Sequence, residues 1–403
     1  MKTFPEILAP AGDLQKLKLA IAYGADAVYC GLPQFSLRAR ENSFSLADLK
    51  QARKLTTAAG VKMYITFNIY PRSNQLAGLE KALKQIKAIK SDAIILADAG
   101  VLYTAKKVLP KMKIHLSVQA NTVNAASVKF WYSQGVRRVV VARELSLREI
   151  ITIKKAVPKM ELEMFVHGAI CMSYSGRCLL SLYLTNRDAN RGVCSQPCRW
   201  NYKLMEETRE GEFFPIEEDQ HGSYILNSKD MCLLPYLREI SAAGVSALKI
   251  EGRNKSIGYL ATILHAYREA LENLKAGKKF NPKLMEEFSS TGNRDFTTGF
   301  FTGSQQDLQN YSRSAGENPQ AFLGIVEKYQ AGRILFEVKN RIDVGEEIEI
   351  LIPRGEILSL KLTEMFDEKM QPIDKAHAGQ ATKAWLQVPR EIPLLSLLRK
   401  CQK

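Results

Sequence analysis

DAIILADAGVLYTAKKVLPKMKIHLSV, residues 92–118, contains an apolar run, an amphipathic stretch and a second apolar run. The runs over 92–97 and 113–118 are short and rich in β-branched residues, which is typical of buried strands. The stretch over 100–109 has helical periodicity. A strand, a helix and a strand in this order predict a βαβ unit and therefore a parallel sheet.

The same alternation extends over residues 1–275. Eight apolar runs stand between helical patterns, at residues 6–8, 26–30, 62–68, 92–97, 113–118, 137–141, 161–166 and 246–250. Eight such repeats predict a TIM-like (β/α)8 barrel over 1–275. A doubly wound sheet is the alternative, and it is disfavoured because no Gly-x-Gly-x-x-Gly follows the first run.

The regular alternation of strand and helix patterns is interrupted once, at residues 168–245, and it stops after residue 275. Residues 168–245 stand where one loop and one helix are expected, and an insertion of that length is usually functional. Residues 276–318 are polar and predict a linker with some helix. Alternating runs then predict a small antiparallel β-barrel domain over 319–403, with strands at 322–328, 333–338, 346–352, 358–365 and 381–388.

Composition narrows the class of protein. The 403 residues are 46% hydrophobic and 25% charged, as in ordinary folded domains. No run approaches the length of a membrane span, and the start MKTFPEILAPAG lacks the pattern of a signal peptide, so we expect a cytoplasmic protein without membrane contact. The net charge of +15 favours a polyanionic partner, nucleic acid before membrane.

Cysteines crowd into the insertion. Cys171, Cys178, Cys194 and Cys198 are spaced x6, x15 and x3. Structural zinc sites usually show two tight Cys-x2–4-Cys pairs, whereas a 4Fe–4S cluster accepts ligands from separate loops. The spacing alone is compatible with an iron–sulfur cluster, with a zinc site and with cysteines that bind no metal. Cys232 is a fifth candidate ligand, although it precedes a helical pattern and is equally explained as a core residue.

Polar residues follow six of the eight runs, where a TIM barrel places its active site. They are Asn68, Asp98, Gln119, Asn121, Arg143, Glu144, His167, Glu251 and Arg253. Each of these residues also has a structural interpretation. His167 is equally explained as a buried core histidine, and Glu251 and Arg253 as a salt bridge that closes the barrel. In the insertion, Tyr174, Arg177 and Arg191 offer hydroxyl and guanidinium groups to an anion.

Long motifs carry a family resemblance. They are LAPAG (8–12), GADAVY (24–29), EMFVHGAIC (163–171), YSGRCLLS (174–181), RDANRG (187–192) and LKIEGR (248–253). Together they resemble the signature of the collagenase-like peptidase family of unassigned catalytic type, over at least residues 6–275. The resemblance implies a TIM-like barrel. It also implies a role in hydroxylation, either of ribosomal RNA, of ubiquinone precursors or of the wobble uridine in tRNA.

The single barrel with one small β-domain most resembles the tRNA hydroxylation branch. That resemblance implies hydroxylation of the wobble uridine to 5-hydroxyuridine, with tRNA as the partner and prephenate as a cosubstrate. It also implies a 4Fe–4S cluster on Cys171, Cys178 and Cys194, with Cys198 as the expected fourth ligand and Cys232 in reserve. It gives no indication of the electron donor.

The polar residues at the strand ends and in the insertion are the candidates for the remaining roles. We expect His167, Glu251 and Arg253 to be catalytic, and Arg177, Arg191, Tyr174 and Asn121 to bind the cofactor or cosubstrate. Tyr174, Trp200 and Tyr202 are candidates to stack on bases. The alternatives are a peptidase, as the family name implies, hydroxylation of ribosomal RNA, and an iron–sulfur scaffold for another hydroxylase. A peptidase is disfavoured because no Ser-His-Asp order or His-Glu-x-x-His motif is present.

Overall fold

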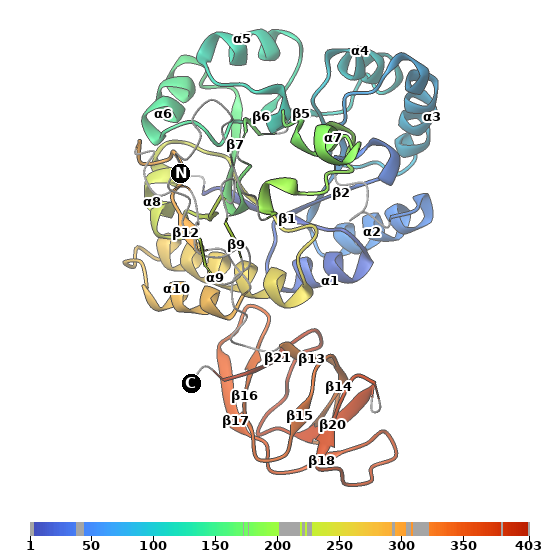
Figure 1. The fold of residues 1–403 in the computed structure, drawn as a ribbon, viewed down its shortest axis with the longest axis vertical. Coiled ribbons are helices and arrows are strands. Elements are labelled where there is room, and N and C mark those ends of the chain that lie inside the picture. Colours follow the sequence, from blue (N-terminus) through green and yellow to red (C-terminus); the bar gives the residue numbers. More distant parts are fainter. Residues whose placement is uncertain are drawn as a thin grey trace, which may run out of the picture.

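The computed structural model describes most of the chain in two bodies, a helix-flanked barrel and a β-domain (Figure 1). The described residues are 4–37, 44–171, 173–175, 177–200, 218–219, 222–223, 228–291, 295–303, 308, 322–379 and 382–401. None of the helices within these ranges is long and apolar enough to cross a membrane.

Eight parallel strands close the barrel, which confirms the predicted fold class. Strand β11 pairs with both β1 and β7 and so joins the ends of the sheet. Each of the eight predicted runs overlaps one of these strands. They are β1 (Glu6–Pro10), β2 (Ala27–Gly31), β3 (Lys62–Phe67), β4 (Ala93–Leu96), β5 (Ile114–Leu116), β6 (Arg138–Val140), β7 (Glu161–Ala169) and β11 (Ala247–Ile250).

Helices cover the outside of the barrel: α1 (Leu14–Ala22), α2 (Leu46–Ala58), α3 (Leu76–Lys87), α4 (Ala99–Val108), α5 (Ala125–Ser133), α6 (Leu147–Ala156), α8 (Leu237–Ala242) and α9 (Ile257–Lys275). Most begin at a side chain that accepts a hydrogen bond from the first turn, for example Asp13 before α1 and Ser45 before α2. Such caps satisfy backbone N–H groups that have no partner within the helix, and they set the first residue of each helix. Short 3-10 turns connect the repeats: η1 (Pro33–Phe35), η2 (Ser73–Gln75) and η3 (Val118–Ala120).

The insertion adds elements between β7 and β11. Strand β7 continues past the predicted end at residue 166, and β10 (Asp230–Cys232) pairs antiparallel with this extension. Strand β12 (Phe296–Thr297) then adds to β10 in parallel. The remaining elements are α7 (Leu180–Thr185), η4 (Ala189–Arg191), η5 (Pro197–Arg199), η6 (Leu234–Tyr236) and the ribbon of β8 (Glu218–Asp219) and β9 (Gly222–Ser223).

The C-terminal domain is an antiparallel half-barrel sheet with its own apolar core. Its strand order is β17, β16, β21, β13, β14, β20 and β18. These strands are β13 (Phe322–Gln330), β14 (Arg333–Val338), β16 (Glu347–Leu351), β17 (Ile357–Lys361), β18 (Met365–Phe366), β20 (Lys383–Gln387) and β21 (Leu397–Lys400). Strand β21 was not among the predicted runs, yet it pairs with both β13 and β16. The pair β15 (Ile342–Asp343) and β19 (Lys375–Ala376) stands apart from this sheet.

The two bodies share a packed contact. The hydroxyl of buried Tyr23 on α1 donates a hydrogen bond to the carbonyl of Leu351, 2.8 Å away in β16. Between them run α10 (Lys283–Glu286) and η7 (Glu287–Ser290), and Arg399 of β21 pairs with Glu287 at 2.6 Å. The half-barrel is therefore held on the α1 and α9 side of the barrel through specific polar contacts.

Candidate functional site

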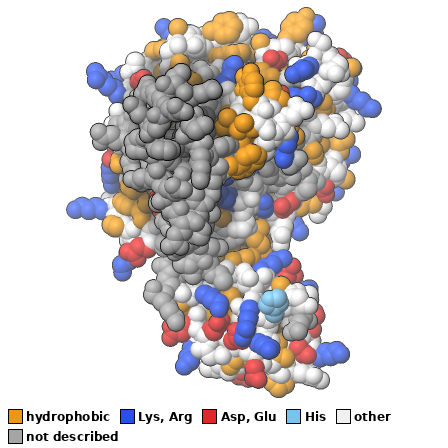
Figure 2. All heavy atoms as spheres, viewed as in Figure 1, with side chains coloured by type: hydrophobic (Ala, Val, Ile, Leu, Met, Phe, Trp, Pro, Cys, Tyr) orange, Lys and Arg blue, Asp and Glu red, His pale blue; other side chains and the backbone are white. Residues whose placement is uncertain are grey.

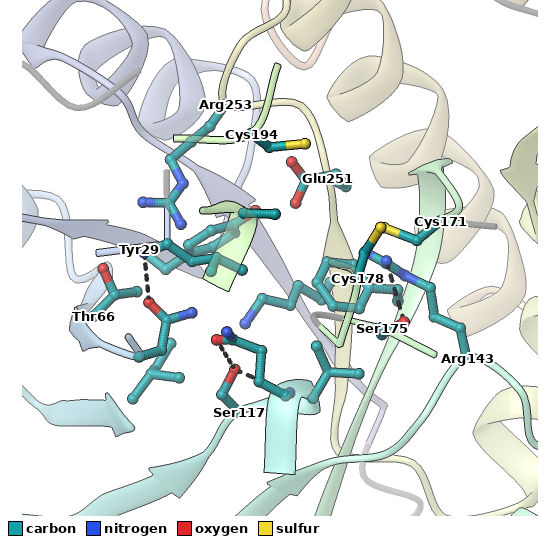
Figure 3. Close-up of a pocket in the computed structure, with 18 of the residues that line it drawn as sticks. Tyr29, Thr66, Ser117, Arg143, Cys171, Ser175, Cys178, Cys194, Glu251 and Arg253 are labelled. Atoms are coloured by element: carbon teal, nitrogen blue, oxygen red, sulfur yellow. Dashed lines mark hydrogen bonds between the residues drawn. The ribbon is translucent and has the colours of Figure 1, made fainter. Parts of the chain in front are cut away.

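A cavity lies at the carboxyl ends of the barrel strands (Figure 3). Its walls come from two sources, the strand ends and the insertion. The strand ends contribute Tyr29, Thr66, Asn68, Gln119, Arg143, Phe165, Lys249, Glu251 and Arg253, and the insertion contributes Cys171, Ser175, Cys178, Leu180, Cys194 and Cys198. The polar residues that follow the predicted strands thus gather in one place, where TIM barrels carry their active sites.

All four crowded cysteines line this cavity as free, half-buried thiols. Burial raises the pKa of the Cys198 thiol, the guanidinium of Arg199 opposes that rise, and the other three cysteines add to it. Within the described ranges, no three His, Cys, Asp or Glu side chains are grouped tightly enough to share one metal ion. Four thiols that line one cavity from separate parts of the insertion are a donor set that an iron–sulfur cluster accepts, whereas structural zinc sites usually use two tight Cys-x2–4-Cys pairs.

Cys232 lies apart from these four thiols. It is buried in β10, opposite His167, and its Sγ is 3.9 Å from the Sδ of Met285. Burial raises the pKa of this thiol to about 12. Cys232 is therefore placed as a core residue, and Cys198 is the cysteine that shares the cavity with the other three.

Lys249 forms the floor of the cavity and is only 5% exposed. Its Nζ donates to the Oε1 of fully buried Glu163 at 2.7 Å and lies 4.5 Å from the ring centroid of Tyr29. Burial lowers the pKa of Lys249, and the carboxylate of Glu163 opposes that shift. Lys249 is not among the residues that the sequence singled out. The signal that would have found it is a lysine in the middle of the apolar strand run 246–250.

Arg253 and Glu251, both expected to be catalytic, line the cavity wall. Arg253 is buried, and its Nη1 donates to the Oγ of Ser36 at 2.8 Å. The guanidinium of Arg253 also lies 5.1 Å from the ring centroid of Tyr29. Figure 3 shows Arg253 above Tyr29, and Glu251 and Cys194 both line the same cavity. Both Arg253 and Lys249 thus lie close to the Tyr29 ring in the lining, where an anion in the cavity would meet them.

Arg143 supplies a third cation and connects the barrel to the insertion. Its guanidinium lies 3.8 Å from the ring centroid of Phe165, and its Nη1 is 3.5 Å from the Oγ of Ser175. The neighbouring Glu144 accepts the backbone N–H of Ser175 at 3.1 Å. These contacts hold the insertion between Cys171 and Cys178 against the end of β6.

His167 lies outside the cavity, although it was expected to be catalytic. Lys249 pairs with Phe165, but the next residue, Ile250, pairs with His167, so Val166 is the extra residue of a bulge in β7. A bulge shifts the alternation of side chains, and His167 turns away from the face that Phe165 shares with the cavity. It packs instead among four aromatic rings, those of Tyr259, Tyr267, Phe288 and Phe296.

This aromatic cage controls the charge of His167. Burial lowers the pKa of His167 to about 3, and neither ring nitrogen has a hydrogen-bond partner among the described residues. The imidazole is therefore neutral at physiological pH. Its surroundings are α9 and the linker that carries Phe288 and Phe296.

The residues expected to bind the cofactor lie around the cavity rather than in its lining. Arg177 donates through Nε to the carbonyl of Gln119 at 3.2 Å. Asn121 ends η3 in the left-handed conformation, and its buried Oδ1 has no hydrogen-bond partner within the described part of the chain. Tyr174 and Arg191 are exposed on the insertion. Trp200 is also exposed, and Tyr202 lies outside the described residues.

The fold and the cavity define a TIM-barrel protein in which four thiols and three cationic side chains meet at the carboxyl ends of the strands. The chain belongs to peptidase family U32: the family model matches residues 12–310, and the model of the family's C-terminal domain matches residues 318–399.

Relatives with several names share this family. The chain is 38% identical to the tRNA hydroxylation protein P of Haemophilus influenzae, over 97% of this chain and 94% of the relative. It is 34% identical to the tRNA hydroxylation protein P1 of Bacillus subtilis, over 98% and 94%. It is also 32% identical to a protein named collagenase from Porphyromonas gingivalis, over 93% of both chains. The likeness thus extends over both bodies of the molecule.

Proposed function

We propose that this chain is a cytoplasmic RNA-modifying enzyme that hydroxylates the wobble uridine of tRNA to 5-hydroxyuridine. The observation that carries the proposal is the meeting of four cysteines with Arg143, Lys249 and Arg253 in one cavity. Near full-length likeness to proteins named for tRNA hydroxylation supports the choice of substrate. The net charge of +15 suits a polyanionic substrate.

The proposed cofactor is a 4Fe–4S cluster held by Cys171, Cys178, Cys194 and Cys198. The cavity that the four thiols share supports this ligand set. When bound, such a cluster supplies one-electron redox chemistry. Burial raises the pKa of Cys198, and Arg199 opposes that rise and so favours the thiolate form that a metal requires.

The proposed cosubstrate is prephenate, a dicarboxylate. Arg253 presents a planar guanidinium, which suits a carboxylate through two parallel hydrogen bonds. Lys249 offers a point charge at the cavity floor, and its position over the Tyr29 ring leaves an apolar surface between the two cations. The chain would therefore hold an anionic, partly apolar molecule beside the thiols. Glu251, which lines the cavity with Cys194, is the proposed proton acceptor in this wall.

The target uridine must leave its stack to enter a cavity of this kind. The insertion forms the wall of the cavity through Ser175, Leu180 and Pro197. Arg177 and Arg191 stand on the insertion outside the lining, where we propose that they contact phosphates of the RNA. Chemistry would then occur inside the barrel mouth, while affinity comes mainly from the surface around it.

Peptidase activity is the second candidate, because a relative is named collagenase. Hydrolysis by a nucleophilic side chain needs a base within hydrogen-bond reach of a serine or cysteine. No histidine in the described ranges makes such a bond: His265 contacts the carbonyl of Gly355, and His167 is enclosed by aromatic rings. The arrangement therefore favours RNA modification over peptide hydrolysis.

The proposal is tested by mass spectrometry of nucleosides from bulk tRNA of a strain that lacks this gene. We expect loss of the oxygen-bearing wobble uridines and accumulation of unmodified uridine, and recovery of both when the gene is restored. Complementation with a Cys194→Ala variant should fail. Unchanged tRNA nucleosides in a strain without a second gene of this kind would overturn the tRNA assignment, and a missing hydroxylated base in ribosomal RNA would redirect it.

A further inference from the structure

The insertion exposes large hydrophobic side chains beside the cavity mouth. Eleven such residues are exposed among those described, and five of them lie between residues 174 and 200: Tyr174, Leu179, Tyr183, Leu184 and Trp200. We call these five the rim patch. Tyr183 is 82% exposed, more than any of the other ten. In Figure 2, hydrophobic side chains gather in the region where Figure 1 places α7. Such a concentration marks an interaction surface rather than scattered surface residues.

Helix α7 connects the rim patch to the cavity. Leu180 lines the cavity, and Leu184 follows one turn later on the same side of the helix. Leu179 and Tyr183 are also one turn apart and form a neighbouring, exposed row. One side of the helix therefore reaches into the cavity, while the adjacent side presents apolar groups to whatever approaches the mouth.

Hydrogen bonds hold helix α7, which carries Tyr183, against the neighbouring loop. Ser181 is buried, and its Oγ lies 2.6 Å from the carbonyl of Arg187 and 3.0 Å from the Oγ of Ser195. The hydroxyls of Thr185 and Ser195 are 2.8 Å apart. Three hydroxyl side chains thus join α7 to the loop that contains Cys194. With the backbone of α7 held in this way, only the side-chain torsions of Tyr183 remain to be ordered when its ring binds a partner.

The charge around the rim patch is strongly positive. Residues 171–200 contain four arginines, Arg177, Arg187, Arg191 and Arg199, and a single acidic residue, Asp188. The carboxylate of Asp188 accepts the backbone N–H of Asn190 at 2.9 Å and stabilises the turn. Exposed aromatic rings among arginines are typical of surfaces that bind unpaired nucleic acid, where bases stack on rings and guanidinium groups contact phosphates.

We infer that the rim patch is the docking surface for the unstacked bases of an RNA loop, with Tyr183 as the main stacking residue. The choice of RNA rests on the proposed function, whereas the location and the stacking mode rest on α7 and its exposed row. A paired RNA helix keeps its bases stacked on one another and offers no free ring face to Tyr183. The surface should therefore distinguish loops from duplexes.

The test measures binding of two RNA probes to the purified full-length protein by fluorescence anisotropy. One probe is a tRNA anticodon stem-loop, and the other is the same RNA annealed to a complementary strand. Tyr183→Ala should weaken stem-loop binding about fivefold or more, because stacking contributes on the order of 1–3 kcal/mol per base. Binding of the duplex should change less than twofold, since phosphate contacts dominate it.

Two variants serve as controls. Tyr183→Phe keeps the stacking ring and should bind the stem-loop like the unaltered protein. Tyr103→Ala removes another exposed tyrosine, 63% exposed on α4 and covered by Lys107, and should leave both affinities unchanged. The visible absorption of each anaerobically purified protein reports whether the insertion is intact.

The outcomes separate this inference from the proposed function. If Tyr183→Ala and Tyr103→Ala bind the stem-loop equally well, the inference that the rim patch docks RNA loops is wrong, even if the deletion strain lacks the modified uridines. Failure of the unaltered protein to bind the stem-loop would also overturn it. A Tyr183-dependent preference for loops, together with unchanged tRNA nucleosides in the deletion strain, would keep the docking surface and refute the tRNA assignment.

Discussion

Lys249 and Glu163 form a buried ion pair on neighbouring strands, with the Nζ of Lys249 2.7 Å from the Oε1 of Glu163. Glu163 is fully buried inside the barrel, and Lys249 borders the cavity. Arg138 lies 3.4 Å from the other carboxylate oxygen of Glu163, and Tyr64 donates to Glu6 at 2.8 Å nearby. Lys249 at the floor of the cavity therefore belongs to a network of charged and polar side chains inside the barrel.

Lys249→Met should destabilise the protein, because it leaves the Glu163 carboxylate buried without its nearest cation. Removing one member of a buried pair typically costs about 3–5 kcal/mol of unfolding free energy. The double variant Lys249→Met/Glu163→Gln should recover most of that stability. Thermal unfolding of Lys249→Met, of Glu163→Gln and of the double variant measures the coupling between the two side chains.

The same double variant tests whether Lys249 acts on the ligand. We expect it to fold but to leave tRNA without the hydroxylated uridines, because the cavity floor has lost its cation. Normal nucleoside levels in a strain that carries the double variant would show that the pair is structural only.

The Cys198→Ser variant should bind less iron than the unaltered protein, whereas the Cys232→Ser variant should bind the same amount. Cys198 lines the cavity with the other three crowded cysteines, whereas Cys232 is buried against Met285. Iron and sulfide analysis of anaerobically purified proteins, with visible absorption spectra, makes this comparison. Equal iron loss in both variants, with normal yields of folded protein, would contradict the proposed ligand set.

Arg253→Lys keeps the charge of the cavity wall but removes the planar guanidinium. We expect reduced tRNA hydroxylation, since a lysine cannot make two parallel hydrogen bonds to one carboxylate. Raising the supply of the cosubstrate should partly restore modification if Arg253 binds it. Loss that no concentration of prephenate relieves, in a protein of normal stability, would argue against this role.

His167→Phe should retain tRNA hydroxylation and should be at least as stable as the unaltered protein near neutral pH. The ring nitrogens of His167 have no hydrogen-bond partner among the described residues, and its neighbours are aromatic. An apolar ring of similar size therefore fits the cage. Loss of modification in a folded, iron-containing His167→Phe protein would restore the catalytic role expected from the sequence.

The stability of the unaltered protein should fall more steeply in acid than that of His167→Phe. An unfolded histidine binds a proton below about pH 6.5, whereas burial keeps folded His167 neutral down to a pKa of about 3. Protonation thus favours the unfolded state between those values, and stability is lost as the pH falls. From about pH 7.5 to about pH 5 the extra loss should be about 2 kcal/mol, measured as a difference in unfolding free energy between the two proteins.

Periodicity located all eight barrel strands, because a strand buried on both faces has to be apolar along its length and so stands out from the helices around it. Spacing also identified the insertion and its crowded cysteines. Strand β21 was missed, because its sequence, two leucines followed by two basic residues, does not alternate between apolar and polar residues, and its pairing with β13 and β16 is a tertiary property.

The tertiary structure alone decided which polar residues face the cavity. Alternation along β7 predicts that His167 shares the face of Phe165, but the bulge at Val166 reverses that direction and places His167 among aromatic rings. Lys249 is brought to the floor because β11 pairs with β7, far away in sequence, and Glu163 there compensates its buried charge. Side-chain direction depends on strand register and on long-range pairing, and a single sequence contains neither.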